Sequence, residues 1–129
     1  MSERSADWLN QARRDLENAR WEIKGGYYEW ASFICQQAAE KALKAVYQKL
    51  GGECWGHSIV NLLTGLKEKI SVSENIIQVG RILDRFYITT RYPNGWSSGI
   101  PKDYYTEKDA QDALISAEEI IRFCESFLA

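Results

Sequence analysis

The sequence predicts an all-α protein, an up-and-down antiparallel bundle of four long helices and one short helix. Apolar residues recur at spacings of three and four along most of the chain, which is the period of a helix with one buried face. Short groups of glycine, proline and serine separate these periodic stretches, and no alternating strand pattern or internal repeat interrupts them. At 129 residues the chain is expected to be a single domain, residues 1–129, able to hold a core of its own.

The first helix is expected to begin near Ser5 and to end at Gly25-Gly26. Its apolar stripe contains Leu9, Ala12, Leu16, Ala19 and Ile23, with Trp8 beside them. Charged side chains occupy the opposite face. Two helices joined by so short a glycine turn should lie antiparallel.

The central helix is expected to span Tyr28 to Leu50 and to stop at Gly51-Gly52. One of its stripes is apolar but carries little bulk, so a partner helix can approach closely; it consists of Ala31, Ile34, Ala38, Ala42 and Ala45. A second stripe is polar and consists of Gln37, Lys41, Lys44 and Gln48, flanked by Gln36 and Glu40. The polar stripe faces either a binding cleft or solvent.

A third, short helix follows Ser58, a predicted N-cap, and has apolar residues from Ile59 to Ile70. The fourth helix should start after Ser71 or Ser73. We expect it to end around Thr89-Thr90, because Pro93 disfavours a helical conformation at the residue before it.

Residues 91–105 have no hydrophobic period and contain both prolines of the chain and an Asn-Gly turn signal. Long loops of this kind in compact domains are often functional. Thr106 is the predicted N-cap of the last helix, with Asp109 as its capping-box partner. An apolar stripe from Ala110 to Phe127 then defines that helix.

Composition limits the function classes. The formal net charge of −2 argues against a protein coated with basic residues for nucleic acid, although a local basic patch remains compatible with it. Three cysteines without framework spacing and the lack of an apolar signal segment predict a reduced, cytoplasmic protein. No apolar run approaches the ~20 residues that a bilayer span needs.

Four blocks of sequence carry a family resemblance: FICQQAAEKALKAVY, a glycine-containing turn with His57, LDRFYITTRYP, and KDYYTEKDAQDAL. In this order they resemble the HEPN domain, the higher eukaryote and prokaryote nucleotide-binding domain, over nearly the whole chain. The resemblance implies a four-to-five-helix bundle of the stand-alone prokaryotic type, usually a homodimer. It also implies a minimal nucleotidyltransferase partner encoded nearby, in a toxin–antitoxin-like pair.

Ribonuclease members of this family carry an arginine followed four to six residues later by a histidine, which implies a phosphate-binding cation beside a proton-transfer group. This chain departs from that pattern. Its single histidine, His57, precedes Arg91, and Trp96 stands five residues after Arg91. Tyr92 is a further catalytic candidate, but an unperturbed phenol with a pKa near 10 is a poor acid at neutral pH.

Arg91 is the first candidate for a binding residue. It can act as a fork for phosphate or carboxylate at the mouth of a cleft. Alternatively, Asp84 and Arg91 lie along one line of the fourth helix and form an internal ion pair. Both roles can hold together.

The segment after Arg91 interleaves rings with cations, and its residues are Tyr92, Trp96, Lys102, Tyr104 and Tyr105. This pattern suits stacking on exposed bases while the cations meet phosphates. The alternative, which we favour, is that the rings cover the end of the bundle or a dimer seam.

The remaining candidates are Lys41 and Lys44 for binding, and His57 for proton transfer or for a local hydrogen bond in the turn. Cys54 and His57 are spaced like metal ligands, but a zinc site needs four ligands, so we expect no metal and no cofactor. The sequence therefore predicts a binding and interaction module for nucleotide or RNA. An RNA endonuclease toxin that uses Arg91 with an atypical proton donor, and a purely structural dimeric subunit, are the alternatives.

Overall fold

The computed structural model describes residues 3–52 and 54–129. Its helices are α1 (Ser5–Lys24), α2 (Tyr28–Leu50), α3 (Ile59–Leu66), α4 (Glu74–Asp84) and α5 (Glu107–Leu128). Two short 3-10 helices, η1 (Pro93–Gly95) and η2 (Pro101–Tyr104), lie in the segment between α4 and α5. The predicted all-α class with five helices is confirmed. Three of the five helices are long, because α4 is shorter than expected.

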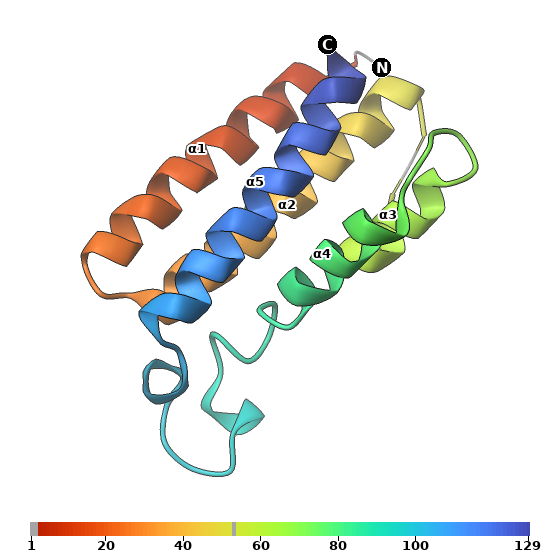
Figure 1. The fold of residues 1–129 in the computed structure, drawn as a ribbon. Helices are drawn as coiled ribbons and strands as arrows, with labels where there is room; N and C mark the ends of the chain where they lie inside the picture. The colour runs from red at the N-terminus through yellow and green to blue at the C-terminus, as the bar shows by residue number, and fades with distance from the viewer. Residues whose placement is uncertain (1–2, 53) are drawn as a thin grey trace.

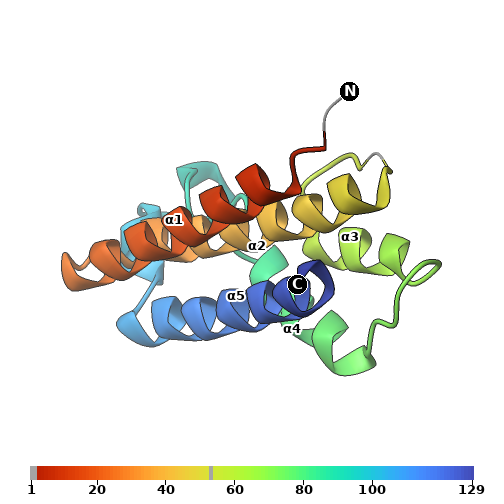
Figure 2. The same ribbon diagram turned by 90° about the horizontal axis from the view of Figure 1, so that it is seen from above.

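Helix α2 lies at the centre of the molecule and packs along α1 on one side and α5 on another. Figure 1 shows that α1 runs opposite to α2, whereas α2 and α5 run in the same direction. An antiparallel pair, α3 and α4, completes the bundle, and Figure 2 shows this pair beside α2 and α5 in the perpendicular view. The small apolar stripe of α2 explains the close packing, since Ala38, Ala42 and Ala45 are fully buried.

The helix ends follow the predicted local signals. Ser58 and Ser73 accept hydrogen bonds from the backbone N–H groups of Asn61 and Ile76, and Thr106 forms a capping box with Asp109. Gly51 ends α2 with a left-handed φ of 74°, a conformation that glycine adopts without steric cost.

The predicted end of the fourth helix at Thr89-Thr90 is wrong, since α4 ends at Asp84. After Asp84, side chains rather than backbone N–H groups donate hydrogen bonds to the backbone carbonyls that would continue the helix. Thr89 Oγ1 donates to the carbonyl of Arg85, Thr90 Oγ1 to that of Phe86, and the Arg91 guanidinium to that of Tyr87. Such side-chain competition replaces the helical ladder with a series of turns. The predicted α3 is also too long, because α3 ends at Leu66 and Ile70 packs on the core from outside it.

The segment between α4 and α5 projects past the end of the bundle, at the end opposite to both chain termini (Figure 1). Among the described residues, no helix is both long and apolar enough to cross a bilayer.

Candidate functional site

One face of α2 carries a line of residues at helical spacing: Trp30, Phe33, Gln37, Glu40 and Lys44. Two segments lie on this face instead of a helix. One is the connector that contains His57, and the other is the turn segment after α4, residues 85–92. The polar stripe of α2 therefore faces other parts of the chain, and the two segments bring their side chains together over it.

His57 is held by the polar block of α2. Gln36, which is fully buried, donates from its Nε2 to the backbone carbonyl of His57 at 2.8 Å. The imidazole Nδ1 lies 3.0 Å from Oε1 of Glu40, whose side chain is 6% exposed. Because a carboxylate oxygen accepts, the geometry places a hydrogen on Nδ1, and in a neutral imidazole with this tautomer Nε2 is the acceptor. The His57 side chain is 52% exposed, which leaves it accessible to a ligand.

Arg91 is fixed by hydrogen bonds and by aromatic rings. Its Nε and Nη2 donate to the carbonyl of Tyr87 at 2.9 and 2.6 Å. Its Cζ lies 4.2 Å from the ring centroid of Phe33, 4.8 Å from that of Tyr87 and 5.1 Å from that of Tyr92. Within the described residues it forms no ion pair with a carboxylate. The result is a half-buried cation without a carboxylate partner among the described residues, whose Nε and Nη2 are bonded while Nη1 forms no hydrogen bond within that part of the chain.

His57 and Arg91 meet around one ring. The imidazole stacks on Tyr87 with a centroid distance of 4.7 Å and an interplanar angle of 19°, and Arg91 contacts the same ring. The imidazole centroid lies 4.7 Å from the centroid of the Tyr87 ring and the Arg91 Cζ lies 4.8 Å from it, so both groups contact the same ring. The sequence places His57 before Arg91, far outside the family spacing, yet the fold brings an arginine and a histidine to the same place.

Asp84 has a different role from the predicted ion pair with Arg91, which is wrong. Its carboxylate accepts from Ser58 Oγ at 2.8 Å, Ile59 N at 2.6 Å and Val60 N at 3.1 Å. It thus caps the N-terminus of α3 from the last residue of α4. The predicted alignment of Asp84 and Arg91 along one helix fails because α4 ends between them.

Lys41 and Lys44 both form ion pairs. Lys41 Nζ contacts Asp15 of α1 at 2.6 Å, on a side of α2 away from His57. Lys44 Nζ contacts Oε2 of Glu40 at 3.0 Å, so it adjoins the His57 pair. Of the two predicted lysines, Lys44 is part of the site.

The loop aromatics form a separate cluster. Trp96 and Tyr104 stack on each other at 3.9 Å, and the edge of Trp96 meets Tyr105. Trp96 Nε1 donates to the carbonyl of Thr89 at 2.8 Å, while the Tyr105 hydroxyl lies 2.6 Å from Thr89 Oγ1. Burial raises the pKa of the Tyr105 hydroxyl, so this phenol is a still poorer acid than an exposed one.

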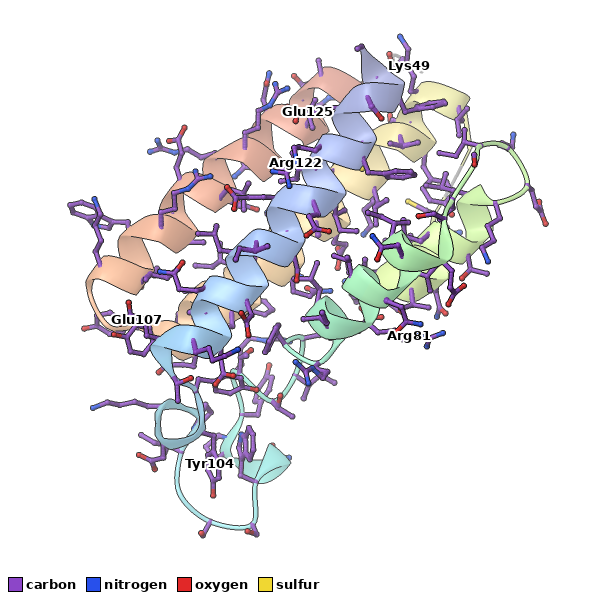
Figure 3. The ribbon with its side chains drawn as sticks, in the orientation of Figure 1. Lys49, Arg81, Tyr104, Glu107, Arg122 and Glu125 are labelled. Carbon is purple, nitrogen blue, oxygen red and sulfur yellow. The ribbon has the colours of Figure 1, made fainter. Side chains whose placement is uncertain are left out.

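These rings cover the end of the bundle, as the favoured interpretation predicted, and Figure 3 shows Tyr104 in the projecting loop, at the opposite end from Lys49. They line an open hollow of about 480 Å³ together with Arg85 and Phe86. Lys102 is exposed on the same loop. Of the residues predicted from the loop, only Tyr92 lies beside Arg91.

Four residues of the site did not stand out in the sequence as functional: Phe33, Tyr87, Gln36 and Glu40. Gln36 and Glu40 belong to the polar block that carried the family resemblance. The sequence therefore marked these two positions but did not indicate that they hold His57. Phe33 and Tyr87 read as ordinary apolar positions, and only the contacts with Arg91 and His57 distinguish them.

Comparisons with known proteins agree with this architecture. The model of the HEPN domain matches residues 5–127. Among solved structures, TT1696 from Thermus thermophilus superposes with a TM-score of 0.94 at 42% identity, covering 97% of this chain and 98% of that one. ST0689, described as an archaeal HEPN homologue, superposes at 0.84 with 40% identity over 100% of both chains.

Two further relatives agree. A HEPN domain protein from Thermotoga maritima superposes with a TM-score of 0.78 at 36% identity, covering 95% of this chain and 97% of that one. A curated protein of Methanocaldococcus jannaschii, named "Putative toxin MJ1304", is 29% identical over 94% of this chain and 86% of its own length. Because the family model covers nearly all of the sequence, this chain belongs to the HEPN domain family.

Proposed function

We propose that this protein is the HEPN member of a toxin–antitoxin-like pair, and that it binds a nucleotide or RNA phosphate at Arg91 while working with a minimal nucleotidyltransferase. The family membership and the toxin name of the relative from Methanocaldococcus jannaschii support this role. We further propose that the protein acts as a homodimer, as the family resemblance implies.

The observation that carries the binding proposal is the state of Arg91. The guanidinium has no carboxylate partner in the described structure, and the three rings and one carbonyl that stabilise it do not neutralise its charge, so an anion can pair with it. Two hydrogen bonds to the Tyr87 carbonyl fix its orientation before any ligand arrives. Little conformational entropy is then lost when a phosphate binds.

Substitution of Arg91 tests the proposal. We expect Arg91→Ala to weaken binding of a single-stranded RNA oligomer at least about tenfold, since a hydrogen bond to a charged group contributes about 1.5–3 kcal/mol. Arg91→Lys keeps the charge but loses the fork, so we expect an intermediate affinity. Fluorescence polarisation with labelled RNA measures both. Equal affinity of the wild type and Arg91→Ala would refute the site.

The partner proposal needs its own experiment. Co-expression with the product of an adjacent nucleotidyltransferase gene, followed by affinity purification, should yield a stable complex. Recovery of this chain alone would count against the pair. Recovery of a complex in which neither protein binds RNA would favour the purely structural subunit.

A second candidate, an RNA endonuclease, is favoured by one observation, the His57–Glu40 pair beside Arg91. In this reaction Nε2 of His57 takes the proton of a 2′-hydroxyl, and the resulting oxygen attacks the neighbouring phosphorus. The bond from phosphorus to the 5′-oxygen breaks, and the leaving oxygen takes a proton from water. The products are a 2′,3′-cyclic phosphate and a 5′-hydroxyl, and Arg91 stabilises the charge on the phosphate.

Cleavage of RNA by the purified protein separates the two candidates. If the protein is a nuclease, His57→Ala should abolish cleavage, and Glu40→Gln should reduce it, because the amide no longer fixes the imidazole tautomer as a carboxylate does. Metal chelation should leave the rate unchanged. If the protein binds RNA without cleaving it, the result supports the binding and interaction module and refutes the endonuclease.

A further inference from the structure

Trp30 continues the aromatic surface one helical turn before Phe33. It lies in the first turn of α2, and its ring meets Phe33 edge-on at 6.3 Å. Phe33 in turn lies 4.2 Å from the Arg91 guanidinium. Trp30 is 45% exposed, so much of its ring is open to solvent beside a fixed cation.

This environment distinguishes Trp30 from the exposed Trp21 and Trp55 and from the half-buried Trp96. Trp55 is 85% exposed in the connector before α3, where no ring or cation of the described residues contacts it. Trp21 is 71% exposed on α1, where Lys24 lies over its ring. Trp96 is already stacked on Tyr104, so that face is occupied. Trp30 instead forms a T-shaped contact with Phe33, which leaves at least one indole face available for stacking.

We propose that Trp30 is a base-stacking subsite, so that the ligand of the Arg91 site is single-stranded RNA with a phosphate at Arg91 and an adjacent base on Trp30. This inference rests on the proposed function and names its ligand class. Single-stranded nucleic acid is bound in general by rings that stack on bases beside cations that meet phosphates. Tyr92, 49% exposed on another side of Arg91, is placed to contact the next nucleotide.

The length of the site favours a strand over a mononucleotide. Trp30 and Glu40 are ten residues apart on one helix, which corresponds to about 15 Å along its axis. A stacked single strand advances by roughly 3.4 Å per nucleotide, so the interval from Trp30 to the His57 pair accommodates several nucleotides. A single nucleotide bound at Arg91 would leave Trp30 or His57 without contact.

The test compares two probes that differ only in their bases. One is an eight-nucleotide 2′-O-methyl RNA, which lacks the nucleophile for cleavage, and the other is an abasic oligomer of the same length. We expect the wild type to bind the base-bearing probe on the order of tenfold more tightly, and Trp30→Ala to lose this preference while its affinity for the abasic probe stays unchanged. Trp30→Phe should restore most of the preference. Trp21→Ala is the matched control and should behave as the wild type.

The outcomes separate this inference from the proposed function. If Arg91→Ala weakens both probes but Trp30→Ala still prefers the base-bearing one, the stacking subsite is refuted and the Arg91 site stands. If Arg91→Ala weakens neither probe, both proposals fail. If Trp30→Ala dissociates a dimer in sedimentation velocity while keeping the base preference, Trp30 belongs to a protein interface and the inference is overturned. Thermal melting of each variant confirms that it is folded.

Discussion

At the scale of single residues, burial sets the chemistry of the three free cysteines. Burial raises the pKa of the Cys35 thiol to about 12 and raises that of Cys124 as well. The pKa of the half-buried Cys54 is also raised, chiefly by desolvation. Lys44 near Cys54 and Arg20 near Cys35 lower the pKa values of these thiols, but desolvation outweighs both cations, so neither thiol is activated. The cysteines of the helices therefore act as small apolar side chains of the core.

We expect one thiol to react in the folded protein. Only the thiolate attacks a disulfide reagent, and at pH 8 neither Cys35 nor Cys124 ionises or is exposed. Titration with 5,5′-dithiobis(2-nitrobenzoate) should detect Cys54 alone, slowly, and all three thiols in guanidinium. Cys54→Ser should reduce the native count to zero. Rapid reaction of a second thiol in the native state would contradict this assignment of burial.

The same groups link stability to pH. Unfolded thiols ionise near their ordinary pKa of 9.0, whereas the buried ones stay protonated. The unfolded state then binds fewer protons than the folded state, so the free energy of unfolding should fall as the pH rises above about 9.

At the scale of elements, the end of α4 decides how the site is built. Up to Asp84 the chain is helical, and beyond it the side chains of Thr89, Thr90 and Arg91 take carbonyls four residues earlier. Hydrophobic period alone continues through Phe86 and Tyr87, so it cannot reveal this change. Helix starts are predictable because serine and threonine caps act locally. The end of α4 instead coincides with these side-chain hydrogen bonds to backbone carbonyls, which leave no mark in the hydrophobic period.

The role of Asp84 gives a stability prediction for this pair of helices. Asp84→Ala removes the acceptor of three hydrogen bonds and leaves the backbone N–H groups of Ile59 and Val60 without their acceptor, so we expect a loss of about 2–3 kcal/mol in the free energy of unfolding. Asp84→Asn should lose less, since the amide oxygen still accepts. Urea denaturation measures both.

Arg81→Ala is the control for this experiment, because Arg81 is exposed on the same helix, and we expect a change within about 0.5 kcal/mol. A fall in RNA affinity of folded Asp84→Ala, without a loss of stability, would instead indicate that Asp84 contacts the ligand.

At the scale of the whole molecule, the sequence predicted the helical class and the positions of α1, α2 and α5, because amphipathic period and caps are local properties. It also singled out Arg91 and His57, yet it could not pair them. Gln36 and Glu40 hold the connector with His57, Phe33 contacts Arg91, and Tyr87 of the turn segment stacks on His57. The approach of Arg91 and His57 depends on these contacts. Such a pair is invisible to a motif that requires a fixed spacing along the chain. His57 and Arg91 lie far apart in the sequence, but the connector and the turn segment that carry them both lie on one face of α2.

The charge of the molecule leads to a final prediction about salt. The net charge is −2 and several cations are paired with carboxylates, so we expect only two or three phosphates of the strand to contact the protein. Such pairs include Arg13–Glu125, Arg20–Glu118 and Lys41–Asp15. Each phosphate contact with single-stranded nucleic acid contributes about −0.7 to the slope of log K against log salt concentration. Two or three contacts therefore give a shallow slope, roughly −1.4 to −2.1.

Two variants test whether the salt dependence of binding comes from the Arg91 cation or from the Trp30 ring. Arg91→Ala should reduce its magnitude by about 0.7, whereas Trp30→Ala should lower the affinity and leave the slope unchanged, because stacking releases no counterion. Arg122→Ala, an exposed cation of α5 labelled in Figure 3, serves as the control and should change neither quantity. Polarisation titrations of the base-bearing probe between about 50 and 200 mM salt measure the slope. A slope steeper than about −4 in the wild type would mean that many dispersed cations bind the strand, and it would contradict a site centred on one guanidinium.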